Sequence, residues 1–269
     1  MSAQDQQPHS PGRESTWNTA SERWVIRALR PLLGLAGPHG ALLLLLTFGG
    51  GIAAVLTVVS AEVYEAVVAS NGVAALDHPA LELALSLRKP WLDVLVTGYT
   101  TIGGPIGMPI LTIMALVALA VTSRSWTPAL LVATASLGSL LMTIAAKQAI
   151  GRMRPPVDAA VPPFEISPSF PSGHSLNALV ISGIVAYVLV LRQQRRRTRI
   201  LTVASAALFA LTMGLSRVYL GHHWFTDVLV AWTLGLAWLA VVITAHRLLR
   251  MTWARRAQSG NQRPVRDFR

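Results

Sequence analysis

Six residues of this sequence carry side chains that suit the binding and transfer of a phosphate group. They are Lys147, Arg154, His174, Arg217, His223 and Asp227. A lysine ammonium is a compact charge, and an arginine guanidinium offers a planar pair of donors for phosphate oxygens. A histidine can act as a nucleophile or as a proton donor, and a carboxylate can orient it. The set therefore predicts a site for a tetrahedral oxyanion.

The spacing around the last two residues indicates which histidine reacts. Asp227 follows His223 by four residues, so on a helix both side chains lie on one face and the carboxylate can accept a hydrogen bond from the imidazole. His222 is five residues from Asp227 and falls off that face, so we favour His223 as the nucleophile. Gly173 precedes His174 at the expected start of a helix, where backbone N–H groups can approach an anion closely.

These residues stand in three short motifs. The motifs are Lys147 with Arg154-Pro155, Pro171-Ser172-Gly173-His174, and Ser216-Arg217 with His223 and Asp227. They resemble the three signature motifs of the type 2 phosphatidic acid phosphatase superfamily, which also includes the vanadium haloperoxidases. Every spacing within the motifs is kept, and the resemblance covers residues 147–227.

The resemblance implies a role for each residue. His223 would attack phosphorus and become a phosphohistidine, with Asp227 orienting it. His174 would protonate the leaving oxygen and then activate water. The phosphoryl oxygens would be held by Lys147, Arg154, Ser172, Gly173 and Arg217. Phosphoryl transfer depends mainly on positioning and on compensation of charge, and three cations supply the charge of a Mg²⁺ ion. We therefore expect no metal and no other cofactor.

The elements that position these residues are expected to be membrane helices. The chain is 52% apolar and only 13% charged, with a mean hydropathy of +0.50, and its apolar residues form long blocks without charge. Six spans are predicted, at about 41–61, 105–122, 127–147, 174–191, 200–216 and 227–246. Segment 91–104 is more polar and ends at Pro105, so we expect a helix packed near the outer surface. The predicted fold is an all-α bundle of six transmembrane helices.

The distribution of charge predicts the orientation of this bundle. With both termini in the cytoplasm, 17 of the 23 Lys and Arg residues lie inside, as the positive-inside rule requires. The motif-bearing helix ends then face the external side of the cell membrane. The net charge of +11 is thus topogenic, and nucleic-acid binding is not expected. The absence of cysteine excludes thiol catalysis and zinc–thiolate sites.

Three regions are expected along the chain. Residues 1–30 form a mostly disordered cytoplasmic tail, in which Arg23, Arg27 and Arg30 mark either an interfacial helix or a simple topogenic cluster. Residues 31–250 form the membrane phosphatase domain, and residues 251–269 a basic cytoplasmic tail.

The predicted function is that of a membrane lipid phosphatase, with the bilayer and a lipid phosphate as its partners. Polyprenyl diphosphate, phosphatidate and phosphatidylglycerophosphate are the candidate substrates. Transfer to an acceptor other than water, and a non-enzymatic lipid carrier on the same scaffold, remain alternatives. Vanadate-dependent oxidation is disfavoured because the haloperoxidases are soluble. Arg152 is expected either to contact a second phosphate or to face water, and Asp158 and Glu165 to face water.

Overall fold

The computed structural model describes residues 40–123 and 125–260, and from Leu42 onward they form one compact unit. All regular structure in these two ranges is helical. The helices are α2 (Gly40–Ala69), α3 (Asp77–Ser86), α4 (Pro90–Ile102), α5 (Gly107–Ser123), α6 (Thr127–Ile150), α7 (Gly173–Val190), α8 (Arg196–Tyr219) and α9 (Phe225–Gly260), with short 3₁₀ turns η2 (Gly72–Leu76) and η3 (Val157–Ala159). The prediction for residues 1–30 lies outside the described residues, as does the tail beyond residue 260.

Five described helices are long and apolar enough to cross a membrane, namely α2, α6, α7, α8 and α9. The pair α4 and α5 makes a sixth span if it is counted as one, bent by 47°. The helical membrane bundle is thereby confirmed. The segment 91–104 is helical as expected, and it meets the following span at this bend.

The bend between α4 and α5 follows from the residues that form it. Pro105 has no N–H group and cannot continue the hydrogen bonding of α4. At Gly107 a Cβ atom would lie 2.5 Å from the carbonyl oxygen of Ile102, so only glycine permits the close return of the backbone. The bend is therefore built into the sequence.

Helix α7 lies at the centre of the bundle. Leu176, Val180, Ile184 and Val188 recur every fourth residue along one of its faces and are almost fully buried. They form the main apolar cluster together with residues of α5, α6 and α9, among them Val132. This packing fixes α7 and, with it, the motif at its first turn.

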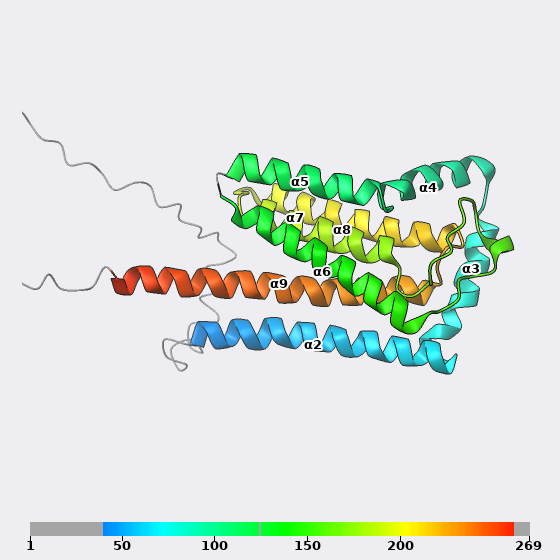
Figure 1. Cartoon of the computed structure of the whole chain (residues 1–269), viewed down its shortest axis with the longest axis horizontal. Coiled ribbons are helices and arrows are strands. Elements are labelled where there is room, and N and C mark those ends of the chain that lie inside the picture. The colour runs from blue at the N-terminus through cyan, green and yellow to red at the C-terminus, as the bar shows by residue number, and fades with distance from the viewer. Residues whose placement is uncertain (1–39, 124, 261–269) are drawn as a thin grey trace, which may run out of the picture. The chain divides into compact units, whose positions relative to one another are not determined.

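One end of the bundle gathers the three motifs. In Figure 1 the end of α6, the starts of α7 and α9 and the end of α8 lie at the same end as α3, α4 and the loop 151–172. The turn between α7 and α8, with its run of arginines at 192–199, lies at the opposite end. The fold therefore separates the motifs from the main basic cluster.

Candidate active site

His223 and Asp227 form a buried pair at the turn between α8 and α9. His223 is 1% exposed and Asp227 is fully buried, and the His223 Nδ1 lies 3.4 Å from the Asp227 Oδ2. The other ring nitrogen, Nε2, lies 3.2 Å from Arg154 Nη1. A guanidinium can only donate, so Nε2 is the acceptor and the ring proton resides on Nδ1, facing the carboxylate. This is the tautomer that a nucleophilic Nε2 requires.

The surroundings of His223 also keep its ring neutral. Burial lowers the pKa of His223 well below its usual value, and the positive charges of Arg154 and Arg217 lower it further. An uncharged imidazole retains the lone pair that a nucleophile needs. The Asp227 Oδ2 is fixed in turn by the backbone N–H of Trp224 at 3.0 Å and by the Ser169 hydroxyl.

Two arginines of different motifs meet at Glu165. Arg154 Nη2 lies 2.7 Å from one carboxylate oxygen of Glu165, and Arg217 Nη2 pairs with the other. Arg217 is 1% exposed, and its Nη1 donates to the Thr100 Oγ1 at 3.0 Å. The Nε of Arg217 is buried without a partner. A carboxylate thus lies between two cations that the motifs assign to phosphate.

The expectation that Glu165 faces water is wrong. Its side chain is only 27% exposed because the loop 151–172 folds back over the helix ends and brings it between the two guanidinium groups. Burial alone would raise the pKa of Glu165, but the positive charges of Arg217 and Arg154 outweigh this and lower it to about 2. Glu165 is therefore ionised at neutral pH. Asp158, by contrast, is exposed as expected.

Lys147 reaches the same loop from the last turns of α6. Its Nζ donates to the Ser167 Oγ at 3.0 Å and to the carbonyl oxygen of Pro168. Arg154 Nε also binds this segment, at 2.7 Å from the carbonyl oxygen of Ser167. The three motif cations therefore share one loop, which carries Glu165 among them.

At the first turn of α7, Ser172 has a different role from Gly173 and His174. The Ser172 Oγ accepts hydrogen bonds from the backbone N–H and the hydroxyl of Ser175, at 3.4 and 2.8 Å, and so caps the helix. The backbone N–H of Ser172 donates to the Asp227 carbonyl oxygen at 3.1 Å, which ties α7 to α9. Gly173 and His174 line the cavity described next, whereas Ser172 is buried behind it.

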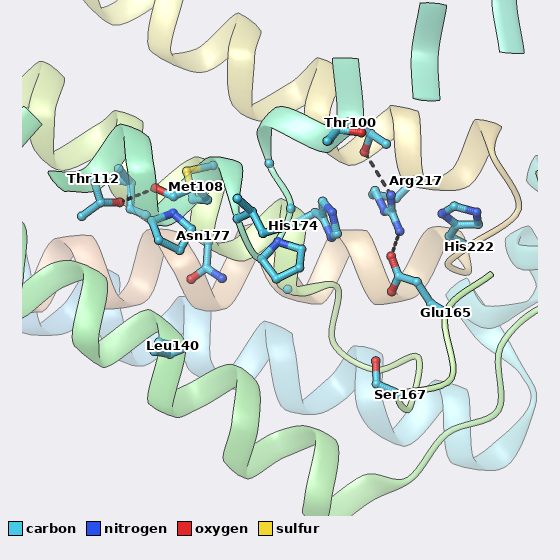
Figure 2. Close-up of a pocket in the computed structure, with 18 of the residues that line it drawn as sticks. Thr100, Met108, Thr112, Leu140, Glu165, Ser167, His174, Asn177, Arg217 and His222 are labelled. Carbon is cyan, nitrogen blue, oxygen red and sulfur yellow. Dashed lines mark hydrogen bonds and ion pairs between the residues drawn. The ribbon is translucent and has the colours of Figure 1, made fainter. Parts of the chain in front are cut away.

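A cavity of about 1080 Å³ joins the motif residues Lys147, Gly173, His174, Arg217 and His223 to the apolar flank of the bundle, whereas Arg154, Ser172 and Asp227 lie outside its lining. Figure 2 shows Arg217, Glu165 and His222 toward one end, His174 and Asn177 further along, and Met108, Thr112 and Leu140 beyond them. Its walls come from the α4–α5 bend, α6, α7 and the loop at 163–167. The cavity is therefore polar at the motifs and apolar along the helices.

Arg152 contacts the buried Asp227 of the His223–Asp227 pair, contrary to both expectations for it. Its side chain is only 17% exposed and is engaged by two carboxylates instead of facing water or the cavity. Its Nη1 lies 2.5 Å from the Asp227 Oδ1, and its Nη2 lies 2.7 Å from the Asp77 Oδ2. This contact could not be predicted from spacing, because Asp77 is 75 residues away in a helix without a motif.

Within residues 40–123 and 125–260, no group of three His, Asp or Glu side chains is arranged to hold a metal ion. The metal-free site expected from the sequence stays a prediction.

Known proteins resemble this chain in sequence and in fold. The family model of the PAP2 superfamily matches residues 126–251. Phosphatidylglycerophosphatase B of Bacillus subtilis (strain 168) is 34% identical over 176 residues, which are 64% of this chain and 83% of that protein.

Two solved structures are also similar. The transmembrane PAP2-type phosphatidylglycerolphosphate phosphatase from Bacillus subtilis has a TM-score of 0.66 and 29% identity, covering 72% of this chain and 96% of that one. Aquifex aeolicus LpxE has a TM-score of 0.51 and 21% identity, covering 62% of this chain and 94% of that one. The second likeness is one of fold alone.

Proposed function

Since the chain belongs to the PAP2 superfamily and is a membrane lipid phosphatase, we propose that it works through a phosphohistidine at the external face of the membrane. The observation that carries this proposal is the placement of His223 Nε2. This atom is unprotonated, lies 3.2 Å from Arg154 and belongs to a ring whose other nitrogen faces a buried carboxylate. Its lone pair accepts from Arg154 in this structure and becomes available to attack phosphorus once that guanidinium turns to a phosphoryl oxygen.

The reaction proceeds in two balanced halves. In the first, His223 Nε2 forms a bond to phosphorus while the bond from phosphorus to the lipid oxygen breaks, and His174 gives that oxygen a proton. In the second, His174 takes a proton from water, whose oxygen attacks phosphorus and breaks the P–N bond. The products are the dephosphorylated lipid and inorganic phosphate, and both histidines return to their starting states.

The cations hold the phosphoryl oxygens during both halves. Arg154 and Arg217 face one carboxylate, and Arg217 has a buried N–H without a partner. A bound phosphate needs the donors that Glu165 now takes. The loop carrying Glu165 therefore releases at least one arginine when substrate binds.

The proposed substrate is a glycerophospholipid of the phosphatidylglycerophosphate type. The relative that is 34% identical is named for that activity. The cavity supports a lipid, because Ile113, Leu137 and Leu140 line it and are also exposed on the flank of the bundle. An acyl chain can lie along them while the phosphate reaches His223.

Charge supports the external placement of the site. The arginines at 192–199 lie at the end of the bundle opposite the motifs. Basic residues collect on the cytoplasmic side of membrane proteins. The motif-bearing end therefore faces outward, with the termini inside.

The test is phosphate release by the detergent-purified protein in EDTA. Phosphatidylglycerophosphate, phosphatidate and a polyprenyl diphosphate are offered side by side, and we expect the first to be hydrolysed fastest. His223→Ala removes the nucleophile and is expected to lower kcat by about a thousandfold or more. Labelled phosphate should stay on the wild-type protein in alkali and be lost in acid, as a phosphohistidine requires.

His246→Ala is the matched control, because His246 lies at the far end of the bundle and binds Tyr187 at 2.8 Å. It should keep wild-type activity. Near-normal activity of His223→Ala would overturn the proposed nucleophile. Activity lost in EDTA and restored by Mg²⁺ would overturn the metal-free mechanism.

A further inference from the structure

Arg152 joins two carboxylates from distant parts of the chain. Its Nη1 binds the Asp227 Oδ1 at 2.5 Å, and its Nη2 binds the Asp77 Oδ2 at 2.7 Å. Nη1 also donates to the Thr226 Oγ1 at 2.9 Å. The Trp224 ring covers the guanidinium, with 5.6 Å from its Cζ to the ring centre. Both terminal nitrogens of the guanidinium are therefore held by acceptors, and one face of it is covered.

Asp77 fastens this arrangement to the start of α9. Its Oδ1 accepts from the backbone N–H of Thr226 at 2.8 Å, and its Oδ2 from the Thr226 hydroxyl at 2.8 Å. The first N–H groups of a helix have no partner within it, so Asp77 serves as a cap supplied by another helix. Asp77 is 3% exposed and Thr226 fully buried.

The two oxygens of Asp227 are divided between two tasks. Oδ1 is bound by Arg152, whereas Oδ2 faces His223 Nδ1 at 3.4 Å. Without Arg152 the carboxylate would lose its only guanidinium partner among the described residues, and only the contacts of Oδ2 with the Trp224 N–H and the Ser169 hydroxyl would hold it. A buried carboxylate deprived of its counter-charge is strongly destabilised, and its orientation toward the imidazole is less firmly fixed.

We propose that Arg152, fixed by Asp77, is a positioning residue that orients Asp227 toward His223 for attack on phosphorus. This inference rests on the proposed phosphohistidine mechanism. Both terminal nitrogens of Arg152 are engaged by Asp227 and Asp77, which lie outside the cavity lining, and Arg152 acts through Asp227 rather than on the substrate. Asp77 holds Arg152 from helix α3, and Arg152 in turn holds Asp227.

A double-mutant cycle tests this assignment. Kinetics on phosphatidylglycerophosphate are measured for Arg152→Gln, Asp227→Asn and the double variant. If Arg152 acts through Asp227, Arg152→Gln lowers kcat by about a hundredfold with KM within about threefold, and the double variant is no slower than Asp227→Asn. Arg152→Lys, which offers one ammonium in place of a fork, should restore only part of kcat.

Two readouts separate this proposal from the proposed function and from a loss of folding. Orthovanadate, a phosphate analogue, is titrated calorimetrically into each purified variant, and Arg152→Gln should bind it about tenfold more weakly than the wild type. That titration needs no lipid substrate, so a wild type inactive on every lipid would overturn the proposed function alone. Arg88→Gln is the matched control, because within the described part of the chain Arg88 donates to the carbonyl oxygens of Ala159 and Tyr219, and this variant should keep kcat within about threefold.

Three results would overturn the inference. The first is a double variant whose loss equals the product of the two single losses, since Arg152 would then act independently of Asp227. The second is a large rise in KM with kcat unchanged, which would place Arg152 on the substrate. The third is wild-type vanadate binding by Arg152→Gln. If Arg152→Gln does not fold, Arg152→Lys with Asp227→Asn supplies the same cycle.

Discussion

Side chains of alternating charge run through the site as one connected series. In order of contact they are Asp77, Arg152, Asp227, His223, Arg154, Glu165 and Arg217. Each charged member has a partner of opposite sign, as buried charges require. Two carboxylates, Asp77 and Asp227, lie behind His223, on the side away from the cavity, and Glu165 lies in front of it, at the cavity. Only the one in front, Glu165, is expected to compete with substrate.

Removing that competition should strengthen the binding of anions. Glu165→Gln keeps the shape of the side chain but frees the charge of Arg154 and Arg217. We expect orthovanadate to bind about tenfold more tightly to this variant. Since the pKa of Glu165 is lowered to about 2, the difference from wild type should be constant from neutral pH down to about pH 4. Calorimetric titration across this range measures it.

Asp158→Asn is the matched control, because Asp158 is exposed in the same loop, and the affinity of this variant for vanadate should equal that of wild type.

The lowered pKa of Glu165 also makes the stability of the folded protein depend on pH. The ionised bridge stabilises the folded protein above the pKa of an unfolded glutamate, about 4.3, and this contribution is lost as pH falls toward the folded value. Weaker vanadate binding by Glu165→Gln would show that the carboxylate assists rather than competes.

The motif residues could be predicted from sequence because their spacing is local. Asp227 follows His223 by one helical turn, and the structure places both side chains together. Arg152 and Glu165 could not be placed, since their partners Asp77 and Arg217 are 75 and 52 residues away. Both residues lie in the loop 151–172, which folds back over the helix ends, and no periodic pattern in the sequence predicts the contacts of such a loop.

At the scale of elements, the spans α6 to α9 were predictable because each is a block of apolar residues between charges. The continuation of α2 to Ala69 and the helix α3 were not. These segments contain Glu62, Glu65 and Glu82 and extend past the apolar blocks. Helix α3 packs against α8 and α9 at the end of the bundle, which composition does not reveal, whereas most of residues 61–69 are exposed.

We expect the bend between α4 and α5 to be sensitive to substitution at Gly107. In Gly107→Ala the new Cβ would lie 2.5 Å from the Ile102 carbonyl oxygen, and backbone cannot move aside as a side chain can. We expect the variant to lose about 2 kcal/mol or more of stability and to hydrolyse lipid more slowly, because the bend lines the cavity. Thermal unfolding in detergent and phosphate release measure both effects.

Gly98→Ala is the matched control for this change. Gly98 lies within α4, and a Cβ there meets nothing within 4 Å. Alanine is the better helix former by about 0.5–1 kcal/mol, so this variant should be as stable as wild type or more so. A Gly107→Ala protein with unchanged unfolding temperature would show that the bend is not constrained at this residue.

At the scale of the whole molecule, the absence of cysteine makes the proposed orientation directly testable. Ile166→Cys places a thiol at a fully exposed position beside the site, and Gln194→Cys places one at an exposed position in the opposite turn. In intact cells a membrane-impermeant maleimide should label the first and not the second. Both should react after permeabilisation, and labelling of Gln194→Cys alone in intact cells would reverse the topology.

Some apolar residues both line the cavity and face outward, among them Ile113 and Leu140. They offer a lipid a route into the cavity from the side of the bundle. A lipid entering along this flank comes from the bilayer sideways, without passing through water. Encounters then depend on diffusion in two dimensions and on the mole fraction of substrate in the membrane. Diluting the substrate with inert lipid should slow the enzyme even when the amount per volume of suspension is unchanged.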